Sequence, residues 1–108
     1  MNKKRLELDE ILCGIINITE PDGDTHVYFD PPMDLKMKYD AIRYKRKITD
    51  KVYANNIAYM YRTPYEVIVI YKDPDSDYVS KLLALPYCSH DRHYTANNLY
   101  HDVFTIYY

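Results

Sequence analysis

The chain of 108 residues contains only two glycines, two cysteines and no tryptophan. The few glycines and cysteines argue against two kinds of structure, a phosphate-binding loop and a disulfide framework. Two glycines leave little room for a phosphate-cradling loop, which needs several close-packed backbone turns. Cys13 and Cys88 lie far apart and form no CxxC pair, so we expect no disulfide framework, and a reducing cytosol is the default environment. Cys13 falls in an apolar helical pattern, where a small buried side chain is expected.

The sequence also lacks a strong net charge and a long apolar run. The formal net charge is −2, so no global field draws the protein to nucleic acid or to a membrane. The first ten residues, MNKKRLELDE, carry charge where a signal peptide would have its apolar core, and no apolar run approaches the length that spans a membrane. We therefore expect a soluble protein without a membrane partner.

Tyrosine, in contrast, is abundant, with fourteen copies in the chain. Its side chain offers a large contact area with few rotatable bonds and keeps a polar tip, which is why protein interfaces are rich in it. A bias in base composition combined with the preference of tyrosine for β-sheets would explain the same count. The tyrosines therefore allow an interface protein without requiring one.

Two segments have the spacing of short amphipathic helices. Residues 3–18 place apolar side chains at helical intervals. Residues 78–85 follow the turn DPDSD, in which Asp75 or Ser76 offers a helix cap, and their pattern stops at Pro86. The expected buried face of the first helix consists of Leu8, Ile11, Leu12, Ile15 and Ile16.

Four segments read as strands. Residues 25–32 are expected to form a short strand that ends at a Pro-Pro pair. In residues 37–48 and 99–108 the side chains alternate between two faces, as in a strand, and one face of the first of these two segments is polar and solvent-exposed. Residues 65–72 are apolar on both sides and should be central. Between the second and third strands, residues 49–64 are expected to form a loop or a distorted hairpin. In the central strand, Val67, Val69 and Tyr71 are predicted to face one way and Ile68 and Ile70 the other.

The expected order is therefore α-β-β-β-α-β, an α+β fold with a mostly antiparallel sheet and two helices packed on one face. The chain shows no internal repeat, low-complexity tract or linker, so residues 1–108 should form a single domain. The stretch before the last strand is expected to be a polar loop in which Asp91 and Arg92 pair.

That loop also holds the candidate metal ligands Cys88, His90 and His93, with His101 nearby. Structural zinc sites usually have two close ligand pairs separated by a longer spacer, whereas three of these candidates crowd into six residues. Cysteine next to histidine has the composition of a catalytic dyad, but nothing local supplies an oxyanion hole. The acidic turns EPDGD and DPDSD lack the register of a calcium loop. We therefore expect no metal, no cofactor and no enzymatic activity.

The basic segment 36–51 leaves three interpretations open. Tyr39 and Tyr44 are interleaved with its cations, as in a strand that binds nucleic acid, so a small nucleic-acid-binding module is the alternative function. Lysines along a solvated sheet edge also block unwanted strand pairing. A basic face that meets an acidic protein partner is the third interpretation. The cations are Lys36, Lys38, Arg43, Lys45, Arg46, Lys47 and Lys51.

Three stretches together resemble a known family. They are VYFDPPMDLKMKYDAIRY, YEVIVIYKDPDSD and LALPYCSHDRHYTANNLYHDVFTIYY. The chain is similar, over nearly its whole length, to the small neck proteins of long-tailed bacteriophages and prophages, which act in tail completion or head–tail joining. Residues 47–60 match least. The residues that carry the resemblance are Pro74, Asp75, Ser76, Cys88, Asp91, Arg92, Tyr94, Asn98, Leu99, His101, Asp102, Phe104 and Tyr107.

The resemblance implies a small α+β protomer of a ring, typically sixfold, between the tail tube and the head-closure or connector complex. The implied partners are copies of the chain itself, the tail tube protein and the closure protein, with genomic DNA passing through the lumen. The implied location is the neck of the virion, assembled in the host cytoplasm. Tail completion or termination is favoured over head closure, since closure proteins tend to be β-barrels and this chain has two helices. The family has no catalytic residues.

A ring that is built head to tail needs two unlike, complementary flanks. The first predicted contact joins neighbouring protomers through a basic set, Lys45, Arg46 and Lys47, and an acidic set, Asp73, Asp75 and Asp77. The second predicted contact joins the ring to the tail tube or the closure ring through Arg92 and His101.

Overall fold

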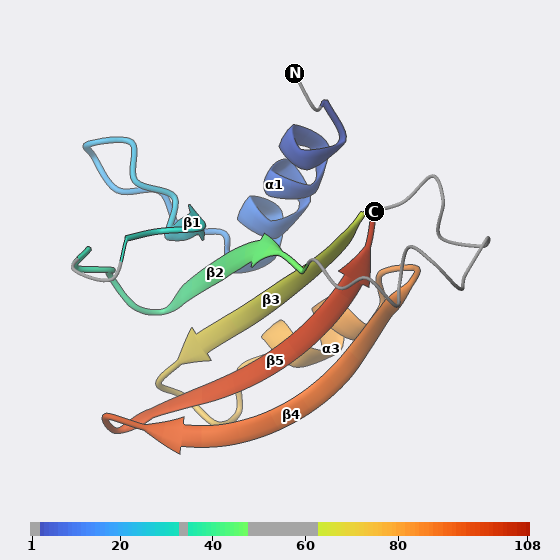
Figure 1. The fold of residues 1–108 in the computed structure, drawn as a ribbon. Coiled ribbons are helices and arrows are strands. Elements are labelled where there is room, and N and C mark those ends of the chain that lie inside the picture. Colours follow the sequence, from blue (N-terminus) through green and yellow to red (C-terminus); the bar gives the residue numbers. More distant parts are fainter. Residues whose placement is uncertain (1–2, 33–34, 48–62) are drawn as a thin grey trace.

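The computed structural model describes residues 3–32, 35–47 and 63–108, which build a five-stranded sheet with two helices (Figure 1). The strand order is β1-β2-β3-β5-β4, in which β1 runs parallel to β2 and the other neighbours are antiparallel. The predicted α+β class with a mostly antiparallel sheet is thereby confirmed. The elements are α1 (Lys3–Ile16), β1 (Val27–Phe29), β2 (Ala41–Arg46), β3 (Pro64–Tyr71), α3 (Tyr78–Leu83), β4 (Cys88–Ala96) and β5 (Leu99–Tyr107).

One strand was not expected. The stretch predicted to be a polar loop forms β4, so the observed order is α-β-β-β-α-β-β. The alternation that marks a strand is absent because β4 is an edge strand, exposed from Ser89 to Thr95, and a β-bulge between His90 and Arg92 shifts its register. The predicted Asp91–Arg92 pair is also wrong, because the Asp91 carboxylate lies beside Lys47 instead.

β4 and β5 form a hairpin closed by two asparagines. Ala96 pairs with Leu99, which leaves Asn97 and Asn98 as a two-residue turn with φ angles of 53° and 63°. A turn with left-handed φ at both central residues matches the twist of the flanking strands, and asparagine tolerates this conformation better than most residues. The hairpin therefore holds β4 against β5 without a glycine.

Helix α1 has the predicted buried face. Leu8, Leu12, Ile15 and Ile16 are buried, while Ile11 is partly buried and packs against the same core. The helix ends two residues earlier than expected, at Ile16, because the next residue, Asn17, adopts a left-handed φ of 52° and donates its N–H to the Cys13 carbonyl (2.8 Å).

Helix α3 forms where the sequence predicted it, but its cap differs. The N-cap position is Asp77, not Asp75 or Ser76. Leu82 is the buried residue of this short helix and belongs to the same hydrophobic cluster as Leu8 and Leu12 of α1. In the view of Figure 1, α3 lies behind β3 and β5. No helix in the described ranges is both long and apolar enough to span a bilayer.

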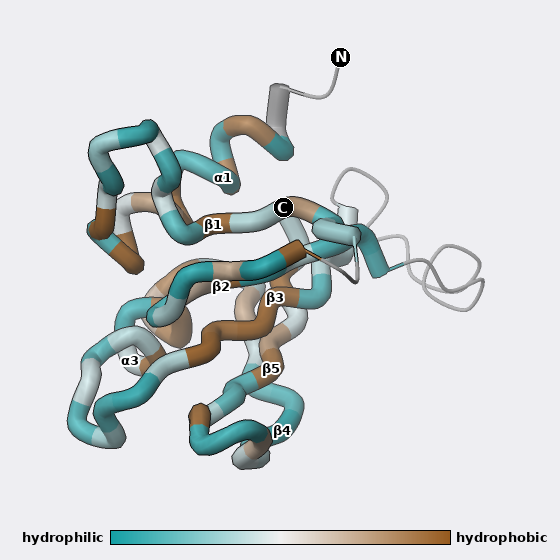
Figure 2. The backbone as a smooth tube through the Cα atoms, turned by 90° about the vertical axis from the view of Figure 1, so that its left-hand side faces the viewer, coloured by the Kyte–Doolittle hydropathy of each residue, from teal (hydrophilic) through white to brown (hydrophobic). Residues whose placement is uncertain are grey.

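Strand β3 lies in the middle of the sheet, as its apolar run predicted, and Figure 2 shows it as a continuous hydrophobic stretch. Val67 and Val69 belong to the core cluster. Ile70 is buried on the opposite side, and the paired residue Ala41 of β2 is buried beside it. The predicted alternation of β2 holds for residues 41–46, whereas most of the loop predicted for 49–64 lies outside the described residues.

Candidate interaction surface

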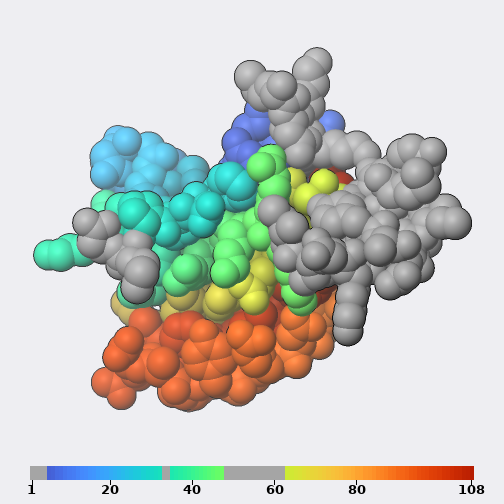
Figure 3. Space-filling model, in the orientation of Figure 1, coloured from blue at the N-terminus to red at the C-terminus, as the bar shows by residue number. Residues whose placement is uncertain are grey.

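The sheet carries a second face, on the side away from the core cluster. Paired residues of neighbouring antiparallel strands point to the same side, so the register determines its membership. Figure 3 views this side, with β2, β3, β5 and β4 following one another across it. We call it the outer face, and it consists of Ala41, Arg43, Lys45, Glu66, Ile68, Ile70, Arg92, Tyr94, His101, Val103 and Thr105.

The predicted basic set does not act as one surface. The Lys45 ammonium lies 3.6 Å from the Glu66 carboxylate. The Lys47 ammonium lies 3.8 Å from Asp91 and donates a hydrogen bond of 3.3 Å to the Thr105 hydroxyl. Both lysines therefore already have acidic partners within the chain.

Arg46 points to the other side of β2. Its guanidinium lies 5.8 Å from the centre of the Phe29 ring, which also has the Arg5 guanidinium at 4.5 Å. Cation–π contacts of this kind stabilise an arginine against an aromatic surface. The structure therefore separates Arg46 from Lys45, although the two are adjacent in sequence.

Two arginines of the outer face have no acidic partner among the described residues. Arg43 is half-buried on β2 and Arg92 is exposed on β4. The register aligns Arg43 with Ile68, Ile68 with Val103, and Val103 with Arg92, so the four side chains form one row across the sheet. The sequence placed Arg43 in the basic segment but did not single it out, since only the strand pairing shows which cations remain unpaired.

The structure brings Arg92 and His101 together. They lie on strands, not on the predicted loop, and the pairing of Tyr94 with His101 places all three residues on the outer face. The Tyr94 ring stacks on the His101 imidazole at 4.7 Å between centroids and 13° between planes. His101 Nδ1 lies 3.1 Å from the Leu99 carbonyl oxygen, which fixes its orientation.

The acidic set forms an exposed turn between β3 and α3. The Asp75 N–H donates to the Asp73 carboxylate (2.9 Å) and the Ser76 N–H to the Asp73 carbonyl (3.1 Å), so the side chain and the backbone of Asp73 both hold the turn. The Asp77 carboxylate lies 3.4 Å from Lys81, one turn along α3. We call residues 73–77 the acidic turn.

The acidic turn and the basic set lie at opposite ends of the β2–β3 pair. Ala41 pairs with Ile70, close to the acidic turn, whereas Arg46 pairs with Tyr65 at the far end. The two predicted charge sets are therefore kept apart within the chain.

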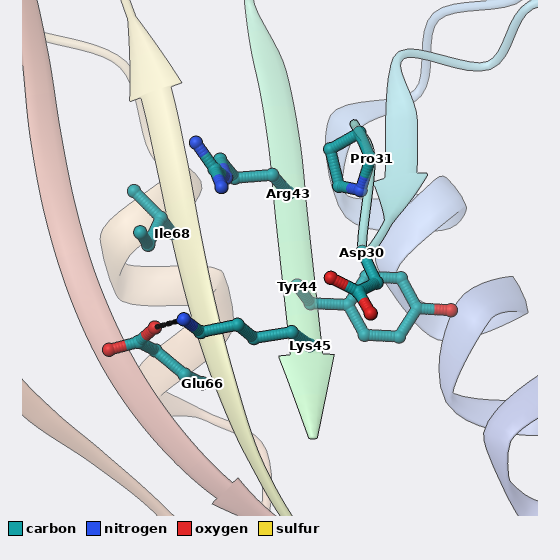
Figure 4. Close-up of a pocket in the computed structure, with 7 residues that line it drawn as sticks. All are labelled: Asp30, Pro31, Arg43, Tyr44, Lys45, Glu66 and Ile68. Atoms are coloured by element: carbon teal, nitrogen blue, oxygen red, sulfur yellow. Dashed lines mark ion pairs between the residues drawn. The ribbon is translucent and has the colours of Figure 1, made fainter. Parts of the chain in front are cut away.

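A small pocket opens where the segment after β1 meets β2 (Figure 4). Its volume is about 10 Å³, which is room for about one water molecule and not for an organic substrate. The figure shows Arg43 and Ile68 on the side of β2 that carries the Lys45–Glu66 pair, while the Tyr44 ring points the other way. The lining residues are Asp30, Pro31, Arg43, Tyr44, Lys45, Glu66 and Ile68.

The core side of the hairpin holds a polar cluster that the sequence did not reveal. The bulge in β4 turns both His90 and His93 toward Asp102, whose carboxylate accepts from His90 Nε2 at 2.8 Å, from His93 Nδ1 at 3.0 Å and from the Tyr71 hydroxyl. Asp102 is buried, so the cluster satisfies a charge that would otherwise be costly. A bulge is not readable from this sequence, so no sequence signal pairs the two histidines.

The candidate zinc ligands are divided by this arrangement. His90 and His93 face Asp102, whereas His101 lies on the outer face. Within residues 3–32, 35–47 and 63–108, no group of three or more histidine, cysteine, aspartate or glutamate side chains is arranged to hold a metal ion.

The two thiols lie in surroundings that disfavour the thiolate. Burial, with a smaller contribution from Asp91, raises the pKa of Cys88 to about 11, and burial likewise raises the pKa of Cys13. In a Cys13→Ser variant at pH 8, the remaining thiol should react with a maleimide or disulfide reagent at least about tenfold more slowly in the folded protein than in urea. Equal rates in the two states would contradict this placement of Cys88.

Comparison of the chain with models of protein families, with curated proteins and with solved structures finds no match.

Proposed function

We propose that this chain is a structural protein of the neck of a long-tailed bacteriophage or prophage. It forms a ring of about six copies that joins the tail tube to the head-closure or connector complex, with genomic DNA passing through the lumen. The proposal rests on the resemblance of the sequence to tail-completion and head–tail joining proteins. The proposed fold has both helices on one side of the sheet. This placement is supported by the core cluster, to which residues of both α1 and α3 belong.

One structural observation supports the ring in particular. The acidic turn follows the end of β3, whereas the arginine row crosses the outer face, and no ion pair joins the two among the described residues. A contact between identical copies closes into a ring only if each copy offers two different, complementary surfaces. Opposite charges placed on separate surfaces meet that requirement and also suppress wrong pairings.

A nucleic-acid-binding module is the second candidate function. The outer face is a more suitable binding surface for it than segment 36–51 as a whole. Arg43 and Arg92 have no ion-pair partner among the described residues, and the exposed Tyr94 offers a ring for base stacking. The pairs Lys45–Glu66 and Lys47–Asp91 on or beside the same face add no net positive charge for phosphates. A DNA mobility shift that weakens steeply with salt would favour this candidate.

The proposed function is tested by complementation of a phage that lacks the chain. Arg92→Ala with His101→Ala should produce heads and tails that do not join, seen by electron microscopy, and a loss of infectious titre of several orders of magnitude. The purified variant should keep the circular dichroism of the wild type, because both side chains lie on the outer face, outside the core cluster. Lys36→Ala, an exposed cation before β2, is the matched control. Normally joined particles in the double variant would contradict the proposed contact.

A further inference from the structure

We propose that the arginine row of the outer face is the surface that receives the acidic turn of a neighbouring copy. Arg43 and Arg92 are the receiving cations, and Asp75 and Asp77 supply the carboxylates. This inference rests on the proposed ring and replaces Lys45, Arg46 and Lys47 as the basic side of the contact between protomers. It also moves Arg92 from the predicted contact with the tail tube or closure ring to the contact between protomers, and leaves His101 in the former.

The first support is the balance of charge on the outer face. Lys45 is paired with Glu66 and Lys47 with Asp91. Arg43 and Arg92 are the cations of this face that take part in no ion pair among the described residues. A carboxylate from outside would gain a partner there without breaking an existing pair.

The second support is the geometry of the row. Arg43 and Arg92 are separated by the two intervening strands β3 and β5, so their Cα atoms lie about 14 Å apart. Between the two arginines, Ile68 is partly buried and Val103 is 0% exposed, so the arginines are the polar ends of the row. A guanidinium binds a carboxylate through two parallel hydrogen bonds, which gives such a contact direction as well as charge.

The third support is the state of the acidic turn. Its backbone is held by the two hydrogen bonds to Asp73, so little conformational entropy is lost when it binds. The Asp75 carboxylate has no partner in the part of the chain that the structure describes, and the Asp77–Lys81 pair is solvent-exposed at both ends. The turn therefore presents exposed carboxylates on a backbone that two hydrogen bonds hold in place.

A protein turn fits this face better than a nucleic acid does. The lysines beside the row are already paired, Lys45 with Glu66 and Lys47 with Asp91, so a phosphate backbone that runs along the sheet meets no additional net positive charge there. Two unpaired cations would also give only a weak, shallow salt dependence with DNA. A compact turn with two carboxylates needs only the two arginines.

The test compares charge reversals in particles complemented with each variant of the full chain. Arg43→Glu with Arg92→Glu should lower the amount of the chain in purified particles by about tenfold or more. Asp75→Arg with Asp77→Arg should do the same, and the combination of all four substitutions should restore at least part of the loss, because each contact again joins opposite charges. Lys36→Glu with Lys38→Glu makes the same change in net charge at two exposed positions before β2, away from the row, and should have little effect.

The possible outcomes distinguish a failure of this inference from a failure of the proposed function. Normal incorporation of the two arginine reversals, or no rescue by the quadruple variant, overturns the arginine row while leaving the neck function intact. Loss of DNA binding with normal incorporation also overturns it, in favour of nucleic acid. Absence of the wild-type chain from particles overturns the function itself. If the reversal variant does not fold, Arg43→Gln with Arg92→Gln serves instead, with a smaller loss expected.

Discussion

Replacement of Phe104 by alanine is expected to lower the free energy of unfolding by about 3–5 kcal/mol. Phe104 is 0% exposed, pairs with Val67 across β3 and β5, and meets the His90 ring edge to face at 5.1 Å between centroids. Removal of the ring loses its burial and leaves a cavity in a core that has few ways to collapse, since the strands around it are held by their ladders. Urea denaturation followed by circular dichroism measures the change.

Tyr94→Ala is the matched control for this prediction. Tyr94 lies on the neighbouring strand β4 but is 39% exposed and points to the outer face. Its loss should change the free energy of unfolding by about 1 kcal/mol or less. A loss below about 1 kcal/mol for Phe104→Ala, or equal losses for the two variants, would show that the core is not centred where the structure places it.

Replacement of Asp102 by alanine has the second largest expected effect, a loss of about 2–4 kcal/mol. The Asp102 carboxylate is 3% exposed and accepts hydrogen bonds from Tyr71, His90 and His93. Alanine leaves the Tyr71 hydroxyl without its acceptor inside the protein, which costs more than the net value of the bond. The histidines are partly exposed and can turn to water, so they add less.

The effect of Asp102 should depend on pH. Burial alone would raise the pKa of its carboxyl, but the hydrogen bonds from Tyr71, His90 and His93 outweigh burial and hold that pKa below its usual range. A pKa that is lower in the folded than in the unfolded state contributes stability above the unfolded value of about 3.9, and this contribution is lost as the pH falls through the folded value.

Asp102→Asn isolates the charge from the shape of the side chain. We compare the free energy of unfolding of the wild type with that of this variant. Titration of Asp102 should leave the difference unchanged from pH 7 to about pH 5 and should reduce it below about pH 4. Urea denaturation of both proteins across this range measures the difference. A difference that stays the same down to pH 3 would contradict the role given to the ionised carboxylate.

Much of the fold is readable from the sequence because its signals are local. Strand β3 follows from an apolar run that is β-branched on both sides, and helix α1 follows from four buried positions at helical spacing. Strand β4 could not be read, because an edge strand exposed along its length has no apolar alternation and its bulge removes the remaining period. An edge strand that is exposed to solvent on both faces does not need apolar side chains on either face, so its sequence shows no alternation.

The candidate surface shows the same limit. The sequence identifies which residues are charged, but pairing decides which charges remain free, and pairing depends on register. Lys45 and Lys47 are paired because β3 and β4 bring Glu66 and Asp91 within reach. Arg43 and Arg92, which lie far apart in the chain, share a row only because three strand pairings align them.

The most direct test of the neck proposal is cryo-electron microscopy of the intact particle whose genome encodes this chain. We expect a closed ring of copies between the tail tube and the head-closure complex, with the acidic turn of each copy against the arginine row of the next. A neck whose density is fully accounted for by other proteins would contradict the proposed function.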